Sequence, residues 1–253
     1  MTSTPYSPKI IVCESDGAAA AIVADLYADL LRDKPAAVLG LATGGTPTAT
    51  YREFVRRYQQ GDVSFARASS FNLDEYVGLS ADHPQSFCYF MRQHLFDHVD
   101  LSADRANVPS GDAIDADAEA RRYEEAIASS GGIDLQLLGI GHNGHIAFNE
   151  PGSARNSRTR VVDLTDETIR NNARFFDSID QVPTTAITMG VGTILEARRI
   201  VLLATGADKS EAVAAAAEGS VSEAVPASLL RHHSEVTFVL DRAAASGLRS
   251  ATG

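Results

Sequence analysis

The stretch that decides the fold reads IDLQLLGIGHNGHIAFNEPGS and spans residues 133–153. Its first part, residues 133–140, is mostly apolar and is typical of a buried strand. Four glycines between positions 139 and 152 let the backbone turn tightly and approach a ligand. His145 and Glu150 stand in this segment, and an imidazole beside a carboxylate is suited to proton transfer near neutral pH. We therefore predict a strand that ends in a catalytic loop.

Outside this stretch, short apolar runs alternate with helical patterns. Strands are predicted at residues 9–13, 36–42, 70–73, 133–140, 186–189, 199–204 and 236–240, and helices at residues 17–31, 48–60, 87–98, 116–129 and 209–217. This alternation indicates an α/β fold, and no repeat or linker divides the chain. We predict one Rossmann-like domain over residues 1–253, with an open, mainly parallel sheet and helices on both faces. In such sheets, ligands bind at the carboxyl ends of the strands.

Composition excludes several classes of function. The chain has 253 residues and a formal net charge of −11, which argues against nucleic acid as its partner. No apolar run reaches the length of a membrane span and no signal-type segment opens the chain, so we expect a cytoplasmic protein without a membrane partner. Cys13 and Cys88 are the only cysteines. Their spacing favours two reduced thiols, and we expect no metal site.

Two further segments are candidates for binding an anion. Thr43, Gly44, Gly45 and Thr46 precede the helix at residues 48–60, and a helix N-terminus with free N–H groups binds anions. An ordinary strand–helix turn fits this loop equally well, and its spacing matches no nucleotide-binding motif. Lys209 begins another predicted helix, where a cation opposes the helix dipole unless it faces an anion. A solvent-facing lysine is the alternative.

A pair of acidic residues, Asp74 and Glu75, follows the predicted strand at residues 70–73. Repulsion and partial burial raise the pKa of one carboxylate toward the range of a general base. A solvated acidic turn is the alternative. The polar stretch at residues 164–184 is a candidate active-site lid, since lids exclude water and complete a site. An exposed surface helix is the alternative there.

These segments together resemble the glucosamine/galactosamine-6-phosphate isomerase family. The resemblance covers most of the chain and is most specific in FNLDEYVG (residues 71–78) and GHIAFNEPG (residues 144–152). It implies conversion of glucosamine 6-phosphate to fructose 6-phosphate and ammonia, without an organic cofactor. It also implies that Asp74 moves the proton from C2 to C1 and that His145 opens the sugar ring.

The resemblance extends to the remaining site residues. Glu150 is the implied carboxylate partner of His145. The family's phosphate-binding positions correspond to Gly44, Gly45, Thr46, Arg174 and Lys209, and the predicted substrate-binding set also includes Thr43 and Glu75.

The sequence departs from the family pattern at two positions, and each departure leads to a prediction. Some members have Asp at the position of Asn143. Asn143 can orient His145 by hydrogen bonding, but it cannot stabilise a protonated imidazole through charge. We therefore expect His145 to rely on the carboxylate of Glu150 for that charge. Val162 replaces a lysine of the effector site in hexameric, activated members, and the sequence ends at Gly253. We expect a monomer or a small homo-oligomer.

Two other functions remain open at this point. One is hydrolysis of a phosphosugar lactone by a 6-phosphogluconolactonase-like enzyme. The other is a non-catalytic sugar-phosphate sensor. An acidic chain without a helix-turn-helix segment fits the sensor poorly, and the joint presence of Asp74, His145 and Glu150 favours an enzyme.

Overall fold

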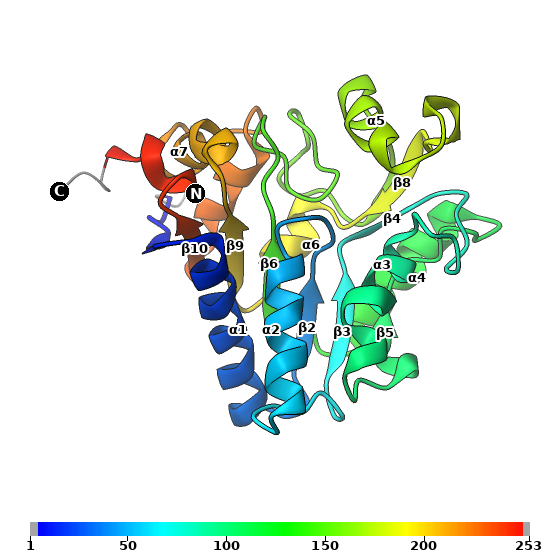
Figure 1. The fold of residues 1–253 in the computed structure, drawn as a ribbon. Helices are drawn as coiled ribbons and strands as arrows, with labels where there is room; N and C mark the ends of the chain where they lie inside the picture. Colours follow the sequence, from blue (N-terminus) through cyan, green and yellow to red (C-terminus); the bar gives the residue numbers. More distant parts are fainter. Residues whose placement is uncertain (1–4, 250–253) are drawn as a thin grey trace.

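A computed structural model describes residues 5–249 of the protein (Figure 1). Its strands are β1 (Lys9–Cys13), β2 (Val38–Leu41), β3 (Ser69–Asn72), β4 (Asp74–Tyr76), β5 (Ala106–Asn107), β6 (Leu135–Leu138), β7 (Arg160–Asp163), β8 (Thr185–Thr188), β9 (Ile200–Ala204) and β10 (Val236–Asp241). Its α-helices are α1 (Asp16–Asp33), α2 (Thr48–Gln59), α3 (Phe87–His94), α4 (Ala116–Ser129), α5 (Asp166–Asn172), α6 (Val191–Leu195) and α7 (Ser210–Glu218).

Seven strands form the central sheet, in the order β1-β10-β9-β6-β2-β3-β5. Every neighbouring pair in this sheet is parallel. All residues of β2, β6 and β9 are buried, as expected for parallel strands that are covered on both faces. The predicted open, parallel Rossmann-like sheet is confirmed.

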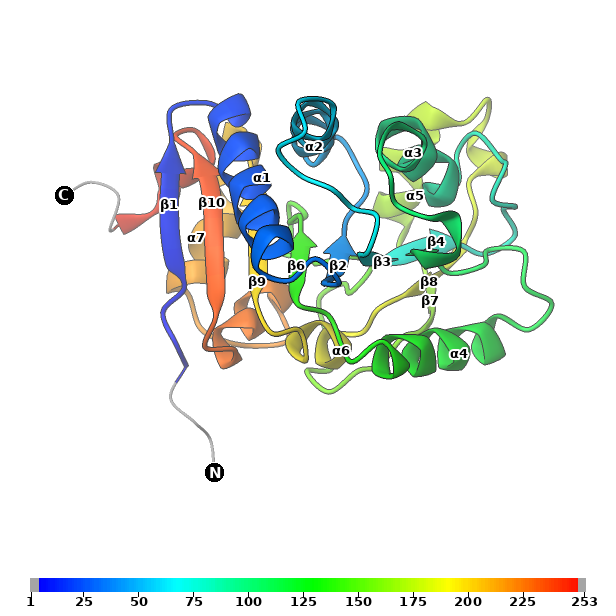
Figure 2. The same ribbon diagram turned by 90° about the horizontal axis from the view of Figure 1, so that it is seen from below.

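Helices cover both faces of this sheet, as predicted. Figure 2 shows α1, α2 and α3 on one face and α4, α6 and α7 on the other. The apolar stripe that α2 buries includes Tyr51 and Phe54. Tyr27 of α1 is fully buried, and its hydroxyl donates to the carbonyls of Gly40 (2.7 Å) and Leu135 (3.2 Å), which fixes α1 against β2 and β6.

A second sheet, which the sequence did not predict, stands beside the carboxyl ends of the main strands. It contains β4, β8 and β7 in that order, and both pairings are antiparallel. Thr188 of β8 lies opposite Asp74 on one side and opposite Arg160 on the other. Asp74 therefore belongs to a buried strand, and the alternative of a solvated acidic turn is wrong.

The candidate lid at residues 164–184 is partly helical. Thr165 caps α5 by accepting a hydrogen bond from the backbone N–H of Thr168, and two short 3₁₀ turns follow α5. Figure 1 places α5 beyond the carboxyl ends of the central strands. Within residues 5–249, no helix combines the length and apolar character that a membrane span requires.

At the amino ends of the central strands, one buried carboxylate links the segments that lead into β2, β6 and β9. Asp134 precedes β6, and its side chain is only 4% exposed. It accepts hydrogen bonds from Lys34 (2.8 Å), Arg198 (2.8 Å) and the backbone N–H of Val38 (2.8 Å). Burial by itself raises the pKa of Asp134, but the hydrogen bonds and the charges of Lys34 and Arg198 outweigh it and hold the pKa below its usual range.

We predict that Asp134→Ala lowers the free energy of unfolding by about 2 kcal/mol at neutral pH, since it leaves a buried N–H and two cations without their acceptor. The depressed pKa means that this contribution is present above about pH 4 and is lost as the pH falls through the folded-state pKa. Urea unfolding at pH 7 and pH 3 measures both values. Asp33→Ala, which removes an exposed carboxylate beside Lys34, is the control and should change little. Equal losses for Asp134→Ala at both pH values would contradict the assignment.

Candidate active site

Four consecutive strands of the central sheet present the predicted site segments at one edge. These strands are β9, β6, β2 and β3. Their carboxyl ends lead to Lys209, to the loop at residues 139–153, to residues 43–46 and to Asp74. Because parallel strands end at the same edge, the topology brings these segments to one side of the molecule (Figure 1).

Asp74 is the most strongly perturbed group at this edge. Its residue is 6% exposed, and its place in β4 opposite Thr188 removes it from bulk solvent. Burial, reinforced by the neighbouring charge of Glu75, raises the pKa of Asp74 to about 8. A carboxyl with that pKa accepts and returns protons near neutral pH, which an ordinary aspartate does poorly.

Glu75 is held differently from its neighbour. Its carboxylate accepts three backbone N–H bonds of 2.9 Å, from Tyr76 and from Phe87 and Cys88 in the first turn of α3. Burial raises the pKa of Glu75 to about 7, against these three donors, which favour the ionised form. Both of its oxygens are occupied and the residue is 1% exposed. The geometry thus supports an anchoring role for Glu75 more than the substrate contact that the sequence predicts.

His145 and Glu150 meet in the loop that follows β6. Nδ1 of His145 lies 3.5 Å from Oε1 of Glu150. Burial by itself raises the pKa of Glu150, but His145, Asn143 and Thr168 stabilise the ionised form and lower this pKa to about 2. Glu150 is therefore a permanent negative charge beside the imidazole at neutral pH.

Asn143 joins the backbone of this loop to the carboxylate. Its Oδ1 accepts from the backbone N–H of His145 (3.1 Å), and its Nδ2 donates to Oε2 of Glu150 (2.7 Å). The sequence predicts that Asn143 orients His145, and the structure shows the contact at the backbone of His145, with Glu150 linking it to the ring. An amide is suited to this position, because an ionised Asp would repel Glu150.

Glycine 141 determines where the His145 ring lies. A Cβ built on Gly141 would stand 2.2 Å from Cε1 of His145, so the ring packs directly over the glycine backbone. The N–H of Gly141 also donates to the carbonyl of His145 (2.9 Å). Nδ1 of His145 is buried and has no hydrogen-bond partner within residues 5–249, and the charged group beside it is Glu150, with Oε1 3.5 Å away.

The second sheet holds this loop beside Asp74. Thr188, the strand partner of Asp74, accepts a hydrogen bond at its hydroxyl from the backbone N–H of Phe148 (3.2 Å). The buried Asn149 side chain donates to the carbonyl of Met189 (2.8 Å) and accepts from Arg160 (3.0 Å). The sequence did not predict these contacts of Thr188 and Arg160, because they arise only from the long-range pairing of β7 and β8.

The predicted anion-binding residues are only partly assembled. Gly44 has a φ of +110° and is exposed, and α2 begins directly after Pro47. Lys209 stands at the N-cap of α7, with Nζ 3.3 Å from Nε2 of His142 and 3.5 Å from Oδ2 of Asp208. The predicted set of site residues does not include His142, although its position directly after a strand-end glycine is a signal for it.

Arg174 stands apart from the other cations. It is exposed in a 3₁₀ turn of residues 164–184, and its guanidinium lies 4.7 Å from the centroid of its neighbour Phe175. Among the described residues, no hydrogen bond or ion pair joins Arg174 to residues 43–46. The structure thus leaves this member of the predicted phosphate set on the candidate lid.

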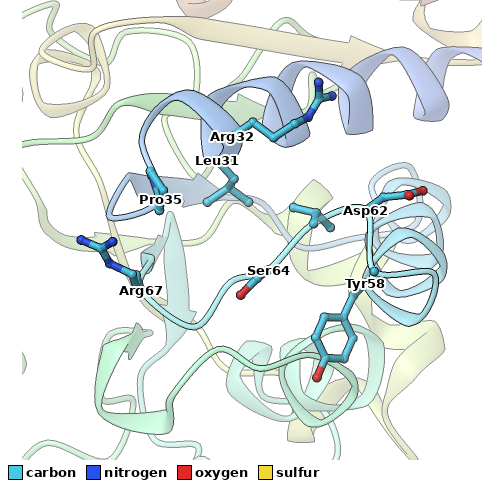
Figure 3. A pocket seen from close by; sticks show the side chains of 9 residues that line it. Leu31, Arg32, Pro35, Tyr58, Asp62, Ser64 and Arg67 are labelled. Carbon is cyan, nitrogen blue, oxygen red and sulfur yellow. The ribbon is translucent and has the colours of Figure 1, made fainter.

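A cavity of about 400 Å³ lies at the amino ends of β2 and β3, away from the edge that carries the predicted site (Figure 3). Pro35, Ser64 and Arg67 line it before β2 and β3 begin, together with Leu31 and Tyr58 from the last turns of α1 and α2. None of the predicted site residues lines it. Within residues 5–249, no group of three or more His, Cys, Asp or Glu side chains is arranged to hold a metal ion.

Comparison with known proteins identifies the family. A family model described as glucosamine-6-phosphate isomerases/6-phosphogluconolactonase matches residues 14–239. The chain belongs to this family. It is 57% identical over 238 residues to a glucosamine-6-phosphate deaminase of Rhodopirellula baltica, which covers 94% of this chain and 95% of the relative. It is 52% identical over 240 residues to a glucosamine-6-phosphate deaminase of Cellvibrio japonicus, which covers 95% of this chain and 91% of the relative.

A solved structure of the same family confirms the fold. It is described as a monomeric glucosamine-6-phosphate deaminase, and it superimposes with a TM-score of 0.92 at 50% sequence identity. The match covers 94% of this chain and 99% of that chain. The family resemblance predicted from FNLDEYVG and GHIAFNEPG is therefore confirmed.

We predict that Gly141→Ala lowers turnover about tenfold or more while the protein stays folded. The new methyl group must displace the His145 ring, and misplacing a catalytic group by about 1 Å costs up to ~100-fold. Gly139→Ala is the matched control, since nothing lies within 4 Å of its added Cβ. Steady-state kinetics and thermal melting of both variants provide the test. Equal turnover in Gly141→Ala and Gly139→Ala would show that the position of the His145 ring does not affect catalysis.

Proposed function

We propose that this protein converts glucosamine 6-phosphate to fructose 6-phosphate and ammonia. The observation that carries the proposal is the buried Asp74, whose pKa is raised to about 8 beside a separate His145–Glu150 pair. Aldose–ketose isomerisation needs one carboxylate near C1 and C2 and a second acid–base group near the ring oxygen. The names of the relatives that share this chain's family support the same reaction.

In the proposed reaction, His145 transfers a proton at the ring oxygen and the pyranose opens to the aldehyde. The ionised Glu150 stabilises the imidazole while its charge changes. Asp74 then removes the proton from C2 while O1 of the aldehyde takes a proton from the substrate's ammonium group, which gives an enolamine, and Asp74 returns its proton to C1. The resulting imine at C2 adds water, whose oxygen becomes the ketone oxygen, and ammonia leaves. These reaction steps are redox-neutral overall, so no electron carrier is needed.

The phosphate is proposed to bind where the sheet edge offers N–H groups and a cation. Residues 43–46 and the N-terminus of α2 present backbone donors, and Lys209 adds a positive charge. Arg174 is proposed to join them when the segment carrying it moves. Binding the phosphate group of the substrate at these residues holds C1 and C2 of the sugar beside Asp74. A phosphosugar substrate supports the proposed cytoplasmic location, and the solved relative described as monomeric supports a monomer or a small homo-oligomer.

We predict that the wild-type protein releases ammonium and fructose 6-phosphate in equal amounts, and that Asp74→Asn lowers kcat by about a thousandfold. Because the ionised carboxylate is the base, kcat/KM of the wild type should fall as the pH drops below about 8. Coupled assays of both products across pH measure these values.

The controls separate loss of chemistry from loss of fold. A carboxyl group with a raised folded-state pKa destabilises the protein when it ionises, so Asp74→Asn should melt no lower than wild type at pH 8. Asp163→Asn, which changes an exposed carboxylate of the second sheet, should retain full turnover. Hydrolysis of 6-phosphogluconolactone without ammonium release would favour the lactonase, and sugar-phosphate binding without any product would favour the sensor.

A further inference from the structure

The carboxylate of Glu150 is held by donors from two separate parts of the chain. Asn143, in the same loop, donates to Oε2 (2.7 Å). The hydroxyl of Thr168, on α5, donates to Oε1 (2.9 Å), the oxygen that also faces Nδ1 of His145. One donor is thus fixed by the loop, whereas the other belongs to the candidate lid at residues 164–184.

A second hydroxyl directs the proton of Thr168 toward Glu150. Oγ1 of Thr165 caps α5 by accepting from the backbone N–H of Thr168 (3.2 Å), and it donates to Oγ1 of Thr168 (3.0 Å). Thr168 accepts in that bond, so its own proton is available for the carboxylate. The helix cap and the contact with Glu150 therefore form one continuous chain of hydrogen bonds.

The position of α5 closes this part of the site. The space between α5 and the loop is about 20 Å³ and is lined by residues from both, including His145, Glu150 and Thr168. This volume holds about one water molecule. A hexose phosphate that approaches His145 from this side therefore requires α5 to move away, and that movement breaks the bond between Thr168 and Glu150.

We propose that Thr168 is a positioning residue through which closure of α5 completes the His145–Glu150 pair. With α5 in place, two donors on opposite oxygens prevent the carboxylate from rotating, so Oε1 stays against Nδ1 of His145. With α5 displaced, Asn143 is the one of these two donors that still binds the carboxylate. The assignment rests on the proposed ring-opening role of His145 and Glu150, and it makes ring opening conditional on a closed site.

The test compares Thr168→Val with Thr168→Ser. Valine matches threonine in shape but has no hydroxyl, so kcat should fall about tenfold while KM changes less than about threefold. Serine keeps the hydroxyl and should stay within about threefold of wild type. Ser178→Ala is the matched control, because this exposed lid hydroxyl makes no side-chain hydrogen bond within the described part of the chain. Wild-type kcat in Thr168→Val would overturn the inference.

A double variant distinguishes positioning of the carboxylate from a general effect on α5. If Thr168 acts through the charge of Glu150, adding Thr168→Val to Glu150→Gln should lower kcat by less than about twofold further. A further tenfold loss in the double variant would show that Thr168 acts elsewhere and would overturn the assignment.

A readout that needs no turnover separates this inference from the proposed function. Arg170 and Arg174 are exposed trypsin sites on the same segment. Without the bond to Glu150, α5 should open more often, so trypsin should cut Thr168→Val several times faster than wild type, Thr168→Ser or Ser178→Ala. Equal cleavage rates would overturn the inference even if the wild type is an active deaminase, whereas an inactive wild type would count against the proposed function alone.

Discussion

Two adjacent carboxylates are buried together where β3 leads into the second sheet, and within residues 5–249 backbone N–H groups donate to only one of them, Glu75. Glu75 takes three N–H bonds, two of them from the first turn of α3, whereas Asp74 faces β8 across an antiparallel pair. These donors favour the ionised form of Glu75, whereas burial and the neighbouring charge of Glu75 both raise the pKa of Asp74. This arrangement gives Asp74 the basicity that the proposed chemistry needs.

Strand β8 connects that carboxylate to the rest of the site. Thr188 pairs with Asp74 through the backbone and accepts a hydrogen bond at its hydroxyl from the N–H of Phe148, so one residue holds both the proposed base and the loop that carries His145 and Glu150. The glycine at position 141 and the amide of Asn143 then set the ring and the carboxylate within that loop. The central sheet brings these segments to one edge, and the second sheet links Asp74 to the loop that carries His145 and Glu150.

The central sheet apart from β5 was predictable, because most of its strands are apolar runs between amphipathic helices. The run at residues 9–13 became β1 with the same bounds, and the runs around β6, β9 and β10 differ from the observed strands by a few residues at their ends. The second sheet was not predictable, since DEY in β4 and RVVD in β7 show no apolar alternation and gain their partners only through long-range pairing. The anchoring of Glu75 and the contact of Thr168 likewise depend on where distant helices begin.

The most direct measurement is the titration of the Asp74 carboxyl carbon by ¹³C NMR in the substrate-free protein, with its signal assigned by its loss in Asp74→Asn. The account predicts a midpoint near pH 8, because burial and the charge of Glu75 both oppose ionisation. A midpoint below about pH 5 would place Asp74 among ordinary aspartates and would contradict the claim that burial between the sheets makes it the base.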